Sequence, residues 1–170
     1  MFRMAAELRQ QMLRVGFTDN GGAIHSAERI LNILGVILRY PSLTHINNLR
    51  HLPDAPFSAE ALVAHKAGEK VFIEHVSPHR AFTRLAIERV AAGVSDEEFT
   101  CFVNKHFELA LLTQVETQRL NKLNRSRMDP DRLKSAGISL VKNESDNLIH
   151  EYGLTHPLSG TLNSAPYVKR

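Results

Sequence analysis

Apolar residues recur at helical spacing in the first quarter of the chain. Residues 3–15 carry one every three to four positions and end before Gly16, which predicts an amphipathic helix with these side chains turned inward. The repeating residues are Met4, Leu8, Met12 and Val15. Residues 23–39 are apolar over a wider arc, which predicts a central buried helix that Pro41 prevents from continuing. The arc consists of Ala27, Ile30, Leu31, Leu34, Ile37 and Leu38.

Two shorter stretches have the composition of strands. Residues 70–76, "KVFIEHV", are rich in β-branched and aromatic side chains, and Pro78 closes the segment. Residues 108–113, "ELALLT", predict a second strand. Helical spacing returns between them over residues 79–92, so the predicted order is strand, helical insertion, strand.

Short polar motifs indicate where further helices begin. Ser58 can cap a short helix that runs to about Ala67, and two capping boxes start longer ones. The boxes are Ser95 with Glu98 and Thr113 with Glu116. The second box predicts a helix through about Asn124 with Val115, Leu120 and Leu123 as its apolar positions. Asp129 as a cap and Pro130 in the first turn predict one more short helix.

These elements predict a predominantly helical α+β protein with a small two-stranded unit. Residues 1–142 are expected to form one globular domain, with a helical part over 1–69 and the strand-containing unit over 70–125. Helical periodicity fades after Lys142, so residues 143–170 are predicted to form an extended or flexible arm.

Composition narrows the class of protein. With 43% apolar and 23% charged residues, the 170-residue chain has the composition of a soluble globular protein. It has no apolar run near the ~20 residues of a membrane span and no recognisable secretory signal, so no membrane partner is expected. The one cysteine, Cys101, excludes an internal disulfide and is expected to be buried. A cytoplasmic location fits this composition best.

Basic residues concentrate between residues 114 and 142. This segment holds seven lysines and arginines against three acidic residues, although the net charge of the whole chain is only +3. The candidate nucleic-acid-binding residues are Arg119, Lys122, Arg125, Arg127 and Arg132. A local basic face suits a polyanion such as nucleic acid. An ordinary solvated helix surface explains the same charges.

Glu74 and His75, at the end of the first predicted strand, are the main candidates for chemistry. The pair is either an active or metal-binding site or an ordinary hydrogen-bonded strand end. The motif "IEHVSP" resembles the opening of HNH (ββα-metal) nucleases, and "LALLTQVETQRLN" is similar to their second strand and helix in members without a zinc knuckle. The resemblance covers residues 70–125 and implies that the two strands form an antiparallel pair in a ββα-metal-like unit.

The resemblance implies a nucleic-acid-binding protein with a divalent-metal-dependent endonuclease activity. His75 would be the general base, and Glu74 and Asn121 would be ligands of Mg²⁺ or another divalent cation. The chain departs from the family at Thr117, where a histidine is usual. It also lacks a clear counterpart of the family's middle asparagine, for which Asn104 is the nearest residue.

A second class of function fits the same sequence. The chain could be a non-catalytic interaction protein, such as a small phage- or plasmid-type inhibitor or regulator that blocks a protein partner. The apolar arc in residues 27–38 could also be the seam of a homodimer. The two classes are separated by geometry, because the nuclease hypothesis requires Glu74, His75 and Asn121 to meet around one site.

Overall fold

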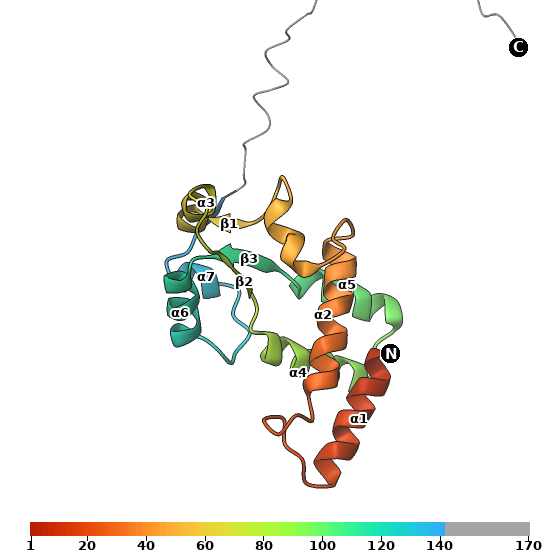
Figure 1. Cartoon of the computed structure of the whole chain (residues 1–170). Coiled ribbons are helices and arrows are strands. Elements are labelled where there is room, and N and C mark those ends of the chain that lie inside the picture. The colour runs from red at the N-terminus through yellow and green to blue at the C-terminus, as the bar shows by residue number, and fades with distance from the viewer. Residues whose placement is uncertain (142–170) are drawn as a thin grey trace, which may run out of the picture.

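The computed structural model describes residues 1–141, in which a layer of helices lies beside a small mixed sheet (Figure 1). Four helices pack on one another in this layer. They are α1 (Phe2–Arg14), α2 (His25–Arg39), α4 (His79–Ala91) and α5 (Asp96–His106). The fold class predicted from the sequence, α+β with mostly helix, is therefore confirmed. Residues 143–170, for which we predict an arm, lie outside the described residues.

The sheet has four strands in the order β2-β3-β1-β4. They are β1 (Phe57–Ser58), β2 (Phe72–His75), β3 (Leu109–Leu112) and β4 (Leu140–Val141). The predicted antiparallel pair is present as β2 and β3, with His75 opposite Leu109. Two strands were not predicted: β1 pairs parallel with β3, and β4 pairs antiparallel with β1. Each has only two residues, too few to produce an alternating pattern in the sequence.

Strand β3 lies inside the sheet and is buried along its whole length. Leu109 and Leu111 belong to the large core shared with the helical layer. Ala110 and Leu112 belong to a second, smaller core with Leu120. Because successive strand residues point to opposite faces, both faces of β3 are covered, which explains its continuous apolar run.

The remaining helices surround the sheet and its connections. They are η1 (Ile46–His51), α3 (Ala59–Lys66), α6 (Gln114–Leu123) and α7 (Arg132–Ser135). Residues 113–116 form the predicted capping box, in which the Glu116 backbone N–H donates to Thr113 Oγ1 at 3.2 Å. The buried Glu116 carboxylate also accepts a 2.7 Å hydrogen bond from Ser58 Oγ. This motif therefore fixes the start of α6 against β1. The caps at Ser58 and Ser95 are present as predicted.

The inward faces of two helices differ from the prediction. Helix α1 buries Phe2, Ala5 and Ala6, whereas Met4 and Val15 are 70% and 74% exposed. Phe2 stacks on Phe99 of α5 with ring centroids 5.0 Å apart, and the small alanines allow α1 to approach its neighbours closely. Helix α6 buries only Leu120 of its three predicted apolar positions, and Val115 and Leu123 are exposed. Tertiary packing thus overrides the apolar periodicity.

Two smaller predictions are wrong. Cys101 is exposed, because α5 turns Phe99, Phe102 and Val103 toward the core instead. The last helix begins at Arg132 rather than next to Asp129. Asp129 Oδ1 accepts a 2.9 Å hydrogen bond from the Asp131 backbone N–H, so it stabilises the turn before the helix. Within residues 1–141, no helix has the length and apolar character needed to cross a membrane.

Candidate functional site

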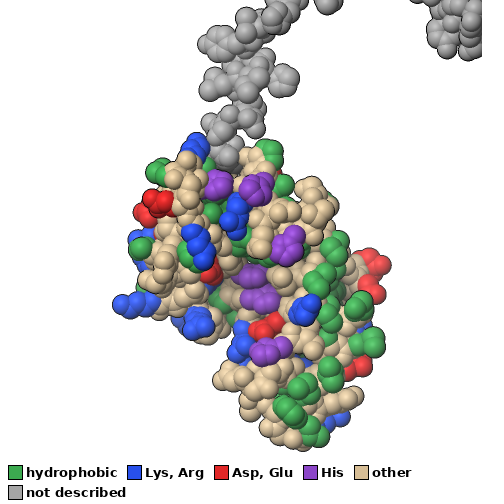
Figure 2. Space-filling view, in the orientation of Figure 1, with side chains coloured by type: hydrophobic (Ala, Val, Ile, Leu, Met, Phe, Trp, Pro, Cys, Tyr) green, Lys and Arg blue, Asp and Glu red, His purple; other side chains and the backbone are tan. Residues whose placement is uncertain are grey.

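A cleft of about 810 Å³ lies where β2 ends. Its wall includes Glu74 and His75 from β2 and Asn121 from α6, the three residues that the sequence analysis placed in one site. Figure 2 shows histidine side chains at several places on this face, one group of them beside a hollow in its middle, with lysine and arginine side chains on both sides. The cleft therefore brings together residues that are about 45 positions apart in the sequence.

Glu74 and His75 reach the cleft from opposite faces of the strand. Adjacent strand residues point in opposite directions. Glu74 faces α6, where Asn121 and Thr117 favour its charged form. His75 faces α4, where its ring stacks on His79 with centroids 4.4 Å apart. Both side chains line one cleft because β2 ends at His75 and Pro78 starts the turn into α4.

His75 is a neutral imidazole over most of the pH range. It lies between His79 and Phe107, whose ring meets it edge-on at 5.3 Å. Burial lowers the pKa of His75 to about 3, and the nearby charges of His79 and Arg132 act in the same direction. Burial also lowers the pKa of His79, whose buried Nε2 atom has no hydrogen-bond partner within residues 1–141.

The pKa of the Glu74 carboxyl is shifted in the opposite direction from that of His75. Burial raises its pKa, and the charge of Arg132 and the polar side chains of Asn121 and Thr117 offset this only in part. Thr117 stands where the HNH family usually has histidine. Its buried Oγ1 has no hydrogen-bond partner within residues 1–141, and a hydroxyl cannot act as an imidazole base.

Arg132 closes the floor of the cleft. It is only 3% exposed. Its Nη1 donates to the carbonyl oxygens of His75 at 2.7 Å and Val76 at 3.0 Å, and its Nε donates to the Asn124 carbonyl at 2.7 Å. Its Nη2 donates to Asn121 Oδ1 at 3.1 Å. One guanidinium thus joins the end of β2 to the end of α6.

The other predicted nucleic-acid-binding residues lie on the surface. Arg119, Lys122, Arg125 and Arg127 are exposed, and Arg125 also lines the cleft. Arg132 differs from them, since its burial leaves it little surface for contact with a backbone phosphate. We therefore treat Arg132 as part of the cleft's framework and keep the four exposed residues as the candidate basic face.

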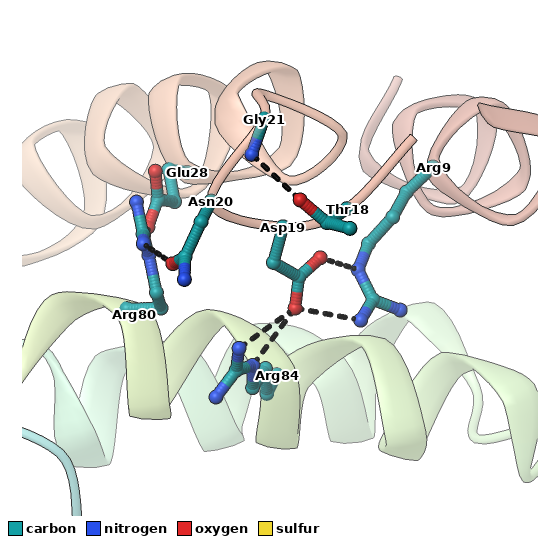
Figure 3. A network of polar contacts seen from close by, with 8 residues as sticks. All are labelled: Arg9, Thr18, Asp19, Asn20, Gly21, Glu28, Arg80 and Arg84. Atoms are coloured by element: carbon teal, nitrogen blue, oxygen red, sulfur yellow. Dashed lines mark hydrogen bonds and ion pairs between the residues drawn. The ribbon is translucent and has the colours of Figure 1, made fainter. Parts of the chain in front are cut away.

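The opposite wall of the cleft comes from α4 and the loop before α2. Arg80 donates to Glu28 Oε1 at 3.0 Å and to Asn20 Oδ1 at 2.9 Å, and all three residues line the cleft (Figure 3). Arg84 Nε donates to Asp19 Oδ2 at 2.9 Å. Asp19 also accepts two hydrogen bonds from Arg9. This network attaches the loop and α1 to α4, so it holds the wall in place.

The charged residues of the lining are mostly basic. Within residues 1–141, four arginines line the cleft against two glutamates, and both histidines there have a lowered pKa and are neutral near pH 7. The four are Arg80, Arg84, Arg125 and Arg132. The first turn of α4, which no side chain of the described residues caps, also borders the cleft. An excess of positive charge and a helix N-terminus both favour an anion.

The donor atoms do not fit a Mg²⁺ site in this arrangement. Mg²⁺ prefers six oxygen ligands and is usually held by one or two carboxylates. Glu74 is the carboxylate on which Asn121 acts, and the Asn121 amide oxygen already accepts a hydrogen bond from Arg132. Within residues 1–141, no three His, Cys, Asp or Glu side chains are grouped so that they could hold a metal ion.

Several residues of the cleft were missed by the sequence analysis. His79 is the first residue of the helix predicted over 79–92, and its spacing of four from His75 across Pro78 is a signal that the two rings could meet. Asn20 and Glu28 gave no local signal, because they are about 50 residues away from β2 in the chain. Asn104, the nearest counterpart of the family's middle asparagine, does not line the cleft.

Comparison with known proteins adds no relative. No protein-family model matches the chain, and no curated protein or solved structure is significantly similar to it.

Proposed function

We propose that this protein binds nucleic acid and that the cleft at the end of β2 receives a phosphate of its backbone. The supporting observation is that Glu74, His75 and Asn121 meet in one cleft whose charged lining has four arginines and two glutamates. Arg125 connects this cleft to the exposed basic residues on and after α6. The resemblance of residues 70–125 to HNH nucleases supports the same class of ligand.

The basic face supplies the contacts to the polyanion. Arg119 and Lys122 are three positions apart on α6, so they lie on neighbouring parts of one helix surface. Such contacts release counterions, so affinity falls with salt, and each lost phosphate contact reduces the slope of log K against log salt by about 0.7 to 0.9.

The test is fluorescence anisotropy with labelled DNA and RNA oligonucleotides over a range of salt concentrations. Arg125→Ala should weaken binding and reduce the salt slope by about 1. Arg14→Ala is the matched control, since Arg14 is an exposed arginine on α1 that does not line the cleft. Equal affinity for the two variants would remove the cleft from the proposed interface.

Cleavage of the bound strand is the further step that the resemblance implies. His75 would be the base, and its neutral imidazole has a free lone pair at pH 7. With a pKa of about 3, however, it accepts a proton weakly. A bound phosphate would oppose the charge of Arg132 and shift the pKa of His75 upward. We therefore propose binding as the primary function and expect any cleavage to be slow.

Incubation of the protein with plasmid DNA in Mg²⁺ or Mn²⁺, or in a chelator, distinguishes a nuclease from a protein that only binds nucleic acid. Cleavage by the wild type that His75→Ala loses would establish the nuclease. Binding without cleavage in either protein would establish a nucleic-acid-binding protein that does not hydrolyse its ligand.

A protein partner is the second candidate, and a different surface favours it. Met4, Ile33 and Ile37 are exposed, and the latter two line an apolar groove of about 430 Å³ where α1, α2 and α5 meet. An inhibitor or regulator would use such a surface. Ile33→Lys should then abolish capture of a partner while leaving oligonucleotide binding unchanged. Sedimentation of the purified protein distinguishes a homodimer from a foreign partner.

A further inference from the structure

The position of Arg132 bears on whether the cleft needs a metal ion. Its guanidinium is held by carbonyl oxygens from the end of β2 and the end of α6, at 2.7 to 3.0 Å. These contacts come from two sides, and Arg132 as a whole is only 3% exposed. Arg132 is thus a fixed component of the cleft rather than a surface side chain that moves to meet a ligand.

The guanidinium also interacts with the two side chains that would have to coordinate a divalent cation, Glu74 and Asn121. Its Nη2 is 3.1 Å from Asn121 Oδ1, the amide oxygen that the HNH resemblance makes a metal ligand. Its charge also acts on Glu74, the carboxylate that would be the second ligand. A divalent ion placed between Glu74 and Asn121 would be repelled by this fixed positive charge. It would also have to compete with Arg132 for the Asn121 amide oxygen.

We infer that the Arg132 guanidinium takes the place of a divalent cation in the cleft, so that the protein binds a nucleic-acid phosphate without a metal ion. This inference rests on the proposed function, and it specifies the cofactor requirement of the same site. The positive charge that an HNH nuclease would obtain from a metal is here supplied by the chain itself. Arg132 acts through its charge, and the exposed arginines of the lining make the direct contacts to the phosphate.

The first test is isothermal titration calorimetry, in which Mn²⁺ at millimolar concentrations is titrated into the full chain. The wild type and Glu74→Gln should give the same trace, with no saturable site that depends on Glu74. One bound Mn²⁺ that Glu74→Gln abolishes would overturn the inference. This measurement involves no nucleic acid, so it decides the inference even if the proposed function fails.

The second test is oligonucleotide anisotropy in a chelator or in Mg²⁺ at matched ionic strength. Affinities that agree within about twofold support the inference, whereas a loss of about tenfold or more in the chelator overturns it. Absence of binding in both buffers would count against the proposed function alone.

A charge-removing variant makes the mechanism specific. Arg132→Gln frees the Asn121 amide and removes the resident charge, so Mn²⁺ should now raise the melting temperature of this variant. The double variant Arg132→Gln with Glu74→Gln should lose that increase. A folded Arg132→Gln protein that gains no Mn²⁺ response would overturn the inference. Should Arg132→Gln fail to fold, the wild-type titration still decides.

Discussion

Two carboxylates near the cleft, Asp19 and Glu74, have opposite electrostatic surroundings. Asp19 accepts hydrogen bonds from Arg9 and Arg84, and the Arg9 guanidinium is the main reason that its pKa is lowered (Figure 3). Glu74 has Arg132 nearby, but that guanidinium donates to Asn121 and three backbone carbonyls, and burial raises the pKa of Glu74.

The difference separates a structural ion pair from a candidate site. Asp19 is 10% exposed and its two oxygens are occupied by guanidinium donors, so it anchors the loop before α2. Glu74 keeps a carboxyl group whose proton is held more tightly than usual, beside a cleft large enough for a ligand. Perturbed groups of this kind, in a cleft with a specific charge partner, are typical of functional sites.

The largest expected effect comes from removing the arginine on the Glu74 side. Arg132→Met leaves the carbonyls of His75, Val76 and Asn124 without their donor in a buried region. We expect a loss of about 3 kcal/mol in the free energy of unfolding, measured by urea denaturation. Arg127→Met, at an exposed arginine, should change it by less than about 0.5 kcal/mol. Equal losses would show that Arg132 is not the tie between β2 and α6.

The ion pair on the Asp19 side should be next in size. Asp19→Asn removes the charge that Arg9 and Arg84 bind, and we expect a loss of about 2 kcal/mol at pH 7. Because the folded-state pKa of Asp19 is lowered, this stability is present above its ordinary value of 3.8 and is lost as the pH falls through the folded value.

In acid, the free energies of unfolding of the wild type and of Asp19→Asn should therefore approach each other. Urea denaturation of both proteins at neutral pH and again well below pH 3.8 measures this change. Asp96→Asn is the matched control, since Asp96 also pairs with an arginine but its side chain is 86% exposed. Such an exposed pair contributes about 1 kcal/mol or less. A difference between wild type and Asp19→Asn that persists in acid would contradict the charge-based explanation.

A third, smaller effect comes from His75. Its folded-state pKa of about 3 lies below the ordinary 6.5, so the unfolded chain binds this proton first as the pH falls. Stability should therefore decrease by about 1 kcal/mol between about pH 7 and 5.5 on account of this residue. Denaturation of wild type and His75→Gln at both pH values isolates the contribution. An equal pH dependence in the two proteins would show that His75 is not desolvated.

The smallest effect is expected at Glu74 itself. Because its folded-state pKa is raised above 4.5, the folded protein holds this proton more tightly, and stability falls as the pH rises through the folded value. Glu74→Gln should then be equal to the wild type at pH 7 or more stable by less than about 1 kcal/mol. A marked loss on this substitution would mean that Glu74 is a structural ion-pair partner like Asp19.

Local motifs made much of the secondary structure predictable. The capping boxes at Ser95 and Thr113 set two helix starts, because each satisfies backbone N–H groups within four residues. Pro78 is a second kind of local signal, because its ring fixes the backbone and limits how far β2 can extend. The bounds of α1 were predicted within one residue, yet its buried face was not, since that face depends on where Phe99 of α5 lies.

The antiparallel pairing of β2 with β3 was implied by the family resemblance. The sequence by itself determined the helical α+β class and placed Glu74 and His75 at a strand end. These properties depend on neighbours along the chain. Only the tertiary structure decided that His79, Arg80 and Glu28 share the cleft. It also decided that Arg132 is buried between β2 and α6 rather than displayed among the basic residues. An arginine looks the same in the sequence whether it is buried or exposed. Only the groups around it in the folded protein decide whether it contacts a ligand or holds the site together.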